Sequence, residues 1–115
     1  MAAVFSRLRQ LQDGWDSYGA PAPSEKAIAN AFTLVTEAIN HGLAVDRAEP
    51  SAMGGVGITF SEGMREVVVE FYNADTAHAL FSDDAADDAR TAAVPTDGAG
   101  YKWIIDEVQK HLDGN

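Results

Sequence analysis

Two adjacent stretches of the chain alternate between apolar and other residues with a period of two. The first is GGVGITFSEG and the second is MREVVVEFYN. Their in-phase apolar residues are Val56, Ile58 and Phe60, then Val67, Val69 and Phe71. This period is typical of strands that bury one face, and the turn SEGM between the runs suits a hairpin. The chain must therefore build an antiparallel sheet, and one face of that sheet needs a cover.

Three helices are expected to supply this cover. The clearest is 25–41, where apolar residues recur at spacings of three and four. Ser24 is a suitable N-cap for it, and Gly42 ends the run. Shorter amphipathic patterns predict helices over 3–12 and 99–112. All three have one apolar stripe, as expected for helices packed on a sheet.

The remaining segments are interpreted as one further strand and two connections. Ala77–Ser82 is predicted to be the third strand, while 44–52, with its proline, is predicted to be a connector. The alanine-rich stretch 83–100 is expected to begin as a loose helical turn or an acidic loop. The predicted fold is a single α+β domain over 1–115. It is a three-stranded antiparallel β-meander with helices packed on one face, in the order α-α-β-β-β-α.

The segment DGWDSYGAPAPS contains two glycines and two prolines and is predicted to be a structured loop. Its large aromatics, Trp15 and Tyr18, are expected to pin the loop to the core. An exposed interface patch is the alternative for this pair.

Composition excludes several kinds of chemistry. The chain has no cysteine, which excludes disulfides, thiol nucleophiles, cysteine zinc sites and iron–sulfur clusters. It has no signal-peptide pattern and no apolar run of membrane-spanning length. A reducing compartment such as the bacterial cytoplasm is therefore the expected location, and no membrane contact is expected.

No motif for nucleophilic catalysis is present. The chain lacks GxSxG and SxxK patterns, and its histidines, His41, His78 and His111, are far apart in sequence. The glycines of Gly54–Gly57 open a strand instead of joining a strand to a helix, so they indicate a bend or a close backbone approach in place of a phosphate-binding loop. We expect no catalytic residue, no metal ligand and no cofactor.

Charge is the strongest compositional signal. Eighteen acidic residues against eight basic ones give a net charge of −10. Residues 1–47 hold five acids and four bases, whereas 48–115 hold thirteen acids and four bases. A protein this acidic is repelled by nucleic acids and anionic membranes and attracted to basic protein surfaces. Solubility alone is the alternative explanation of the charge.

Acidic residues gather where the chain is predicted to form its sheet. Glu66, Glu70 and Tyr72 share the strand face opposite the apolar one, where alternate residues lie about 6.7 Å apart, close to the spacing of phosphates along a nucleic-acid strand. The densest run is Asp83–Asp88. A solvated polar surface and, for the run, a divalent-cation site remain alternatives. The predicted partner-binding residues are Glu62, Glu66, Glu70, Tyr72, Asp75, Asp83, Asp84, Asp87 and Asp88.

The segment GWDSYGAPAPS, with the helix after it and the later GGVG, resembles the opening of a family of small bacterial proteins with a GWDxYGA-P-x-S start. The resemblance covers about residues 8–60 and implies a fold but no chemistry. In size and composition, a small, acidic, cysteine-free chain without a catalytic motif is similar to phage anti-CRISPR inhibitors. Some of these occupy a DNA-binding channel by mimicking nucleic acid.

Three hypotheses follow. The first is a non-enzymatic inhibitor that binds a basic, nucleic-acid-binding surface, with a subunit of a CRISPR interference complex as the specific target. The second is an antitoxin or immunity-type module that neutralises a basic partner. The third is an enzyme that depends on a metal held by the aspartate run.

Overall fold

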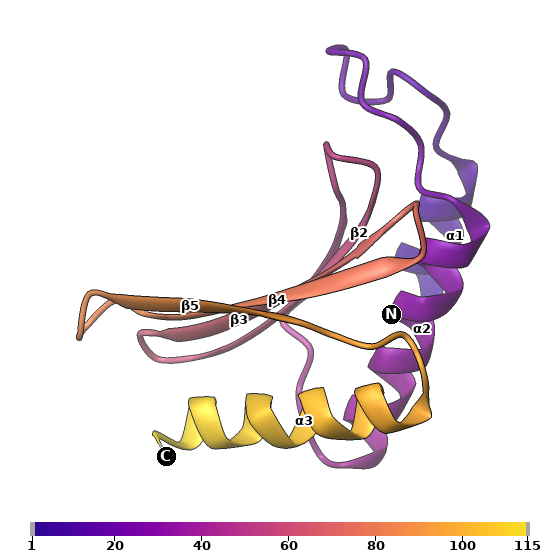
Figure 1. Cartoon of the computed structure of the whole chain (residues 1–115). Helices are drawn as coiled ribbons and strands as arrows, with labels where there is room; N and C mark the ends of the chain where they lie inside the picture. The colour runs from indigo at the N-terminus through magenta and orange to yellow at the C-terminus, as the bar shows by residue number, and fades with distance from the viewer. Residues whose placement is uncertain (1, 115) are drawn as a thin grey trace.

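The computed structural model describes residues 2–114 and shows an α+β architecture (Figure 1). Five antiparallel strands pair in chain order, β1-β2-β3-β4-β5. The sheet is seen nearly edge-on in Figure 1, with α3 along one of its faces. The elements are α1 (Ala2–Gln10), α2 (Glu25–Asn40), β1 (Arg47–Pro50), β2 (Gly55–Glu62), β3 (Arg65–Tyr72), β4 (Thr76–Asp83), β5 (Asp88–Ala93) and α3 (Gly98–Asp113).

The core lies between the sheet and the helices. The in-phase residues of β2 and β3 are all fully buried, which confirms the face predicted from their alternation. Helices α2 and α3 both contact β2 and β3, while α1 lies against α2 and β1. The helical side of the core is filled by Phe5, Ile28, Leu34, Val35, Ile104, Ile105 and Val108. With all three helices on one side, the other face of the sheet has no helix over it among residues 2–114.

Both long helices have capping residues at their ends, and those of α2 include the predicted Ser24 and Gly42. Ser24 accepts a hydrogen bond from the backbone N–H of Ala27 at 3.1 Å at the start of α2, and Gly42 adopts a positive φ just after its end. Asp97 accepts one from Gly100 at 2.7 Å at the start of α3, and Gly114 ends that helix in the left-handed region. These caps satisfy backbone groups that the helices leave free.

The prediction of three strands is wrong, because the sheet has five. The predicted connector 44–52 contains β1, which pairs with β2 along four residues. Its proline is tolerated because it lies at the end of an edge strand, where an N–H is not needed. The predicted acidic loop contains β5, which pairs with β4 from Asp88 to Ala93. Alanine has little strand preference of its own, so pairing with β4 decides this conformation.

The prediction that both aromatics of the N-terminal loop pin it to the core is wrong, because neither belongs to the core or to the side chains packed against it. Trp15 is half-buried and donates its indole N–H to the Pro21 carbonyl at 3.0 Å. Tyr18 is 92% exposed. The loop is held instead by carboxylates, since Asp16 accepts hydrogen bonds from two of its backbone N–H groups.

Helix α1 ends at Gln10, two residues before the predicted limit. Among the residues that the structure describes, no helix combines the length and apolar character needed to cross a membrane.

Candidate partner-binding surfaces

The side of the sheet without helices carries a mixture of charged, polar and apolar side chains, which we call the open face. Strand alternation places Glu66, Val68, Glu70 and Tyr72 of β3 on it, as predicted, because Val67, Val69 and Phe71 point into the core. The neighbouring strands add Arg47, Glu49, Thr59, His78, Leu80 and Thr91.

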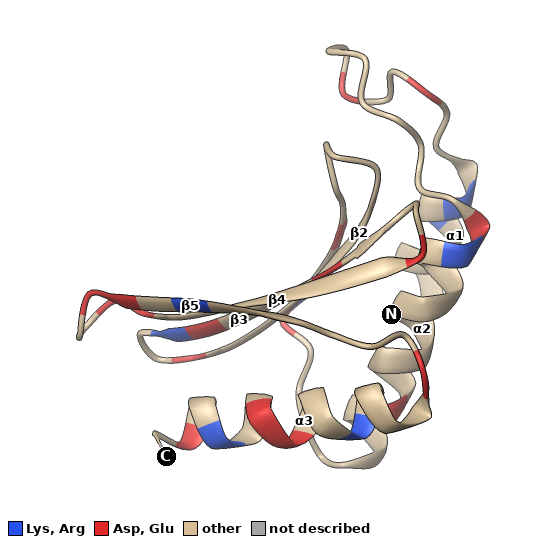
Figure 2. Cartoon of the chain, viewed as in Figure 1, with Lys and Arg blue, Asp and Glu red and all other residues tan. Residues whose placement is uncertain are grey.

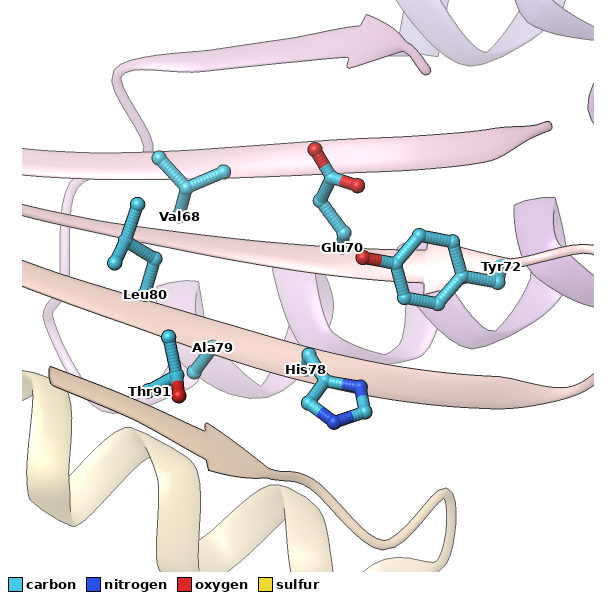
Figure 3. Close-up of a pocket in the computed structure, with 7 residues that line it drawn as sticks. All are labelled: Val68, Glu70, Tyr72, His78, Ala79, Leu80 and Thr91. Atoms are coloured by element: carbon cyan, nitrogen blue, oxygen red, sulfur yellow. The ribbon is translucent and has the colours of Figure 1, made fainter. Parts of the chain in front are cut away.

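A shallow hollow of about 440 Å³ lies over β3, β4 and β5 on this face. Its polar end is formed by Glu70, Tyr72 and His78 and its apolar end by Val68 and Leu80 (Figure 3). The Tyr72 and His78 rings lie 6.2 Å apart. Burial raises the pKa of the Tyr72 phenol, and the charge of Glu70 and a hydrogen bond to it raise that pKa further. The phenol therefore stays protonated at neutral pH.

A second hollow, of about 350 Å³, adjoins the first on the β1 side. Gly57 separates Glu49 from Glu70 in the strand register and has no side chain to fill the space between them. Arg47 forms ion pairs with Glu49 at 2.8 Å and with Glu66 at 3.8 Å. One guanidinium thus offsets part of the negative charge of this side of the open face.

The carboxylates of the open face do not form a phosphate-like row. Glu66 and Glu70 are separated by Val68, so they lie about 13 Å apart along the strand, and Glu66 is paired with Arg47. The open face is therefore a mixed surface with an apolar centre, which is the composition of a protein interface.

A denser negative patch lies at the end of the sheet where the β2–β3 and β4–β5 turns meet, visible as red segments at the left of Figure 2. The two turns are joined by a hydrogen bond from the Asp84 N–H to the Met64 carbonyl at 3.0 Å. Four exposed carboxylates lie here without an ion pair to any residue of the described chain, and we call them the acidic end: Glu62, Asp84, Asp87 and Asp88.

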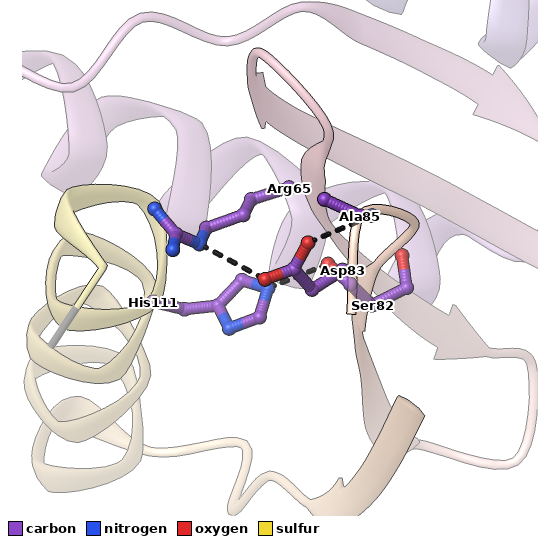
Figure 4. Close-up of polar contacts among 5 residues, drawn as sticks. All are labelled: Arg65, Ser82, Asp83, Ala85 and His111. Carbon is purple, nitrogen blue, oxygen red and sulfur yellow. Dashed lines mark hydrogen bonds and ion pairs between the residues drawn. The ribbon is translucent and has the colours of Figure 1, made fainter. Parts of the chain in front are cut away.

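Asp83 belongs to the same end but has a different role. Its Oδ2 accepts from the Arg65 side chain at 3.3 Å, and its Oδ1 accepts from the Ala85 N–H at 3.1 Å (Figure 4). Beside this pair, His111 of α3 donates to the Ser82 carbonyl at 2.7 Å. Asp83 is thus neutralised and fixes the β4–β5 turn, so it contributes little to the field of the acidic end.

Asp75 lies at the opposite end of β4 from the acidic run, in the β3–β4 turn. Its carboxylate accepts a hydrogen bond of 2.8 Å from the side-chain amide of the buried Asn30, whose own oxygen accepts from the Tyr101 hydroxyl at 3.2 Å. The structure therefore does not bring Asp75 together with the other predicted residues, and its contacts give it a structural role.

The open face offers a carboxylate, a phenol and an imidazole within one hollow, which are groups that can bind a cation or exchange protons. No group of three or more His, Cys, Asp or Glu side chains in residues 2–114 is arranged to hold a metal ion. The aspartate run is extended over a strand end, a turn and a strand start, which separates carboxylates that a helix would have stacked.

Three residues of the open face that sequence reasoning missed come from the strands it also missed. Arg47 and Glu49 alternate with the half-buried Ala48 in β1, and Thr91 is exposed on β5. The alternation of Arg47 and Glu49 was a usable signal, but the following proline favoured a connector. Leu80, which is 43% exposed, follows from the alternation of β4.

Comparisons with protein-family models, with curated proteins and with solved structures each gave no match to this chain.

Proposed function

We propose that the protein is a non-enzymatic inhibitor that binds a basic, nucleic-acid-binding protein surface through its acidic end. In the specific form of this proposal the target is a subunit of a CRISPR interference complex, and the carboxylates take the place of DNA phosphates. The observation that supports it is the convergence, on one end of a chain with a net charge of −10, of four carboxylates that form no ion pair within residues 2–114.

The field of such a patch acts mainly on association. Glu62 ends β2, Asp84 and Asp87 lie in the β4–β5 turn and Asp88 begins β5, so their charges add at one end of the sheet. A concentrated field of this sign speeds encounter with lysine- and arginine-rich surfaces, and salt weakens the effect. Proteins that hold nucleic acid through phosphate contacts present such surfaces.

The test is competition for DNA. Labelled duplex DNA bound to a purified interference complex is titrated with wild-type protein and with a neutral-end variant, which carries Glu62→Gln, Asp84→Asn, Asp87→Asn and Asp88→Asn. The matched control removes four charges elsewhere, with Glu25→Gln, Glu37→Gln, Asp46→Asn and Asp106→Asn. We expect the neutral-end variant to compete about tenfold or more weakly and the control to compete like wild type. Equal competition by both variants would contradict the role of the acidic end.

A pull-down from bacterial lysate at low and high salt, read by mass spectrometry, identifies the target class. Retention of a nucleic-acid-binding complex at low salt, with its loss at high salt, agrees with the proposal. If no partner is retained at either salt concentration, the acidic end is only a solvated surface and the proposal is overturned.

The apolar centre of the open face favours a second candidate, an antitoxin or immunity-type module that neutralises one basic partner. Val68 and Leu80 offer apolar area beside Glu66 and Glu70, and contacts of this kind persist at high salt. A single small partner retained at high salt, and lost on the double reversal Glu66→Lys and Glu70→Lys, would support this candidate over the first.

A further inference from the structure

The two edges of the sheet are protected very differently. Strand β1 is four residues long, ends in Pro50 and carries the exposed charges of Arg47 and Glu49. Helix α1 also lies against it. Short length, proline, charge and a covering element are the devices by which proteins prevent an edge strand from pairing with another chain.

Strand β5 is less protected, and its only charged residues are Asp88 at its start and Arg90. It is six residues long, contains no proline or lysine, and is exposed except at Ala92. Its one basic side chain is turned toward the helices, because the Arg90 guanidinium lies 3.8 Å from the centre of the Phe81 ring and 3.5 Å from the Glu107 carboxylate. The edge therefore presents backbone flanked by small uncharged side chains, those of Ala89, Thr91 and Ala93.

The register with β4 shows which backbone groups of this edge are free. The Val94 N–H donates to the Ala77 carbonyl at 2.9 Å, directly across the ladder. Hydrogen-bonded and non-bonded pairs alternate in an antiparallel ladder, so Ala92 and Arg90 also exchange their bonds with β4. The groups directed away from β4 are those of Ala89, Thr91 and Ala93.

We propose that this edge pairs with the same edge of a second copy of the chain, β5 antiparallel to β5 around a twofold axis. The free N–H and C=O groups are symmetric about Thr91. Thr91 therefore lies opposite Thr91 of the second copy, and Ala89 lies opposite Ala93. The two sheets become continuous, and the helices of both copies lie on the same side.

Charge and hydrogen bonding select this register and this partner. Centring the pair on Arg90 would oppose two guanidinium groups and use backbone groups already bonded to β4. With Thr91 at the centre, the Thr91 residues of the two copies lie opposite each other at the twofold axis. Threonine pairs of this kind stabilise neighbouring strands. The Asp87 turns of the two copies then lie at opposite ends of the seam, about 27 Å apart. That distance exceeds the Debye length of about 8 Å at physiological ionic strength, so the negative charge does not prevent pairing.

The first test is the molar mass in solution, by light scattering and sedimentation. The wild-type protein is expected at twice the mass of one chain. Thr91→Pro removes only an outward N–H and is expected at the mass of one chain, with an unchanged circular dichroism spectrum. Thr91→Val keeps that N–H and is the matched control, expected to stay dimeric. A wild type that is monomeric up to its solubility limit, or a Thr91→Pro variant that remains dimeric, would overturn the proposal.

A second test examines the register without relying on a proline variant. The chain has no native cysteine, so Ala89→Cys and Ala93→Cys each introduce a single thiol. Directly opposite Cα atoms lie about 5.5 Å apart in a hydrogen-bonded pair, within disulfide range. Mixing the two variants under mild oxidation should give cross-linked heterodimers, whereas each variant alone places its thiols about 13 Å apart and should not cross-link. Equal cross-linking within each variant alone would refute this register.

Discussion

Replacing Asp75 with alanine is expected to destabilise the fold, although the residue is exposed. Its carboxylate accepts the hydrogen bond of 2.8 Å from Asn30, whose side chain is buried and has Tyr101 as its other partner. Alanine leaves that amide without its acceptor, at a cost of about 1.5–3 kcal/mol for a bond to a charged group. Asp75 also has a φ of 64°, which costs alanine about 1 kcal/mol more.

The expected sum is about 3 kcal/mol, which lowers Tm by roughly 10–15 °C for a chain of this size. Urea unfolding followed by tryptophan fluorescence measures the free energy directly. Asp75→Asn is the matched control, because asparagine keeps an acceptor oxygen and tolerates the left-handed region. It should stay within about 1 kcal/mol of wild type. Equal stability of the alanine and asparagine variants would refute the role assigned to this hydrogen bond.

Two further predictions concern local geometry and pH. Gly55→Ala should cost more than about 3 kcal/mol, because a Cβ there would lie 1.9 Å from the Phe71 carbonyl oxygen. Gly57→Ala, whose Cβ meets nothing nearer than 3.9 Å, should change thermal melting little. Backbone N–H groups, chiefly that of Ala20, hold the Asp16 pKa below its usual 3.8. The stability it supplies is therefore present above pH 3.8 and lost as pH falls through the lowered pKa. Asp16→Asn should flatten the acid side of the stability–pH curve, and an unchanged curve would contradict this.

Local patterns were sufficient for the elements that contact the core. The alternation of β2 and β3, and the helical period between Ser24 and Gly42, each reflect burial of one face of a single segment. Such burial requires apolar residues at regular positions within that segment. Strand faces and helix limits were therefore predictable from the segment alone.

The edge strands were decided by their neighbours. Strand β5 is alanine-rich and has weak preferences of its own, and it becomes a strand because β4 offers free backbone groups along Thr76–Asp83. Strand β1 is similarly defined by its pairing with β2. Pairing between segments depends on register and on the positions of other elements, neither of which a local pattern contains.

The sequence by itself determined that the chain is acidic, lacks thiol chemistry and builds an antiparallel sheet with one buried face. Only the tertiary structure decided which carboxylates act together. It placed Glu62 at the same end of the sheet as Asp84, Asp87 and Asp88, paired Asp83 with Arg65, and used Asp75 as a hydrogen-bond acceptor for a buried amide. The physical reason is that composition sets the amount of charge, whereas turns and register set the distances on which its interactions depend.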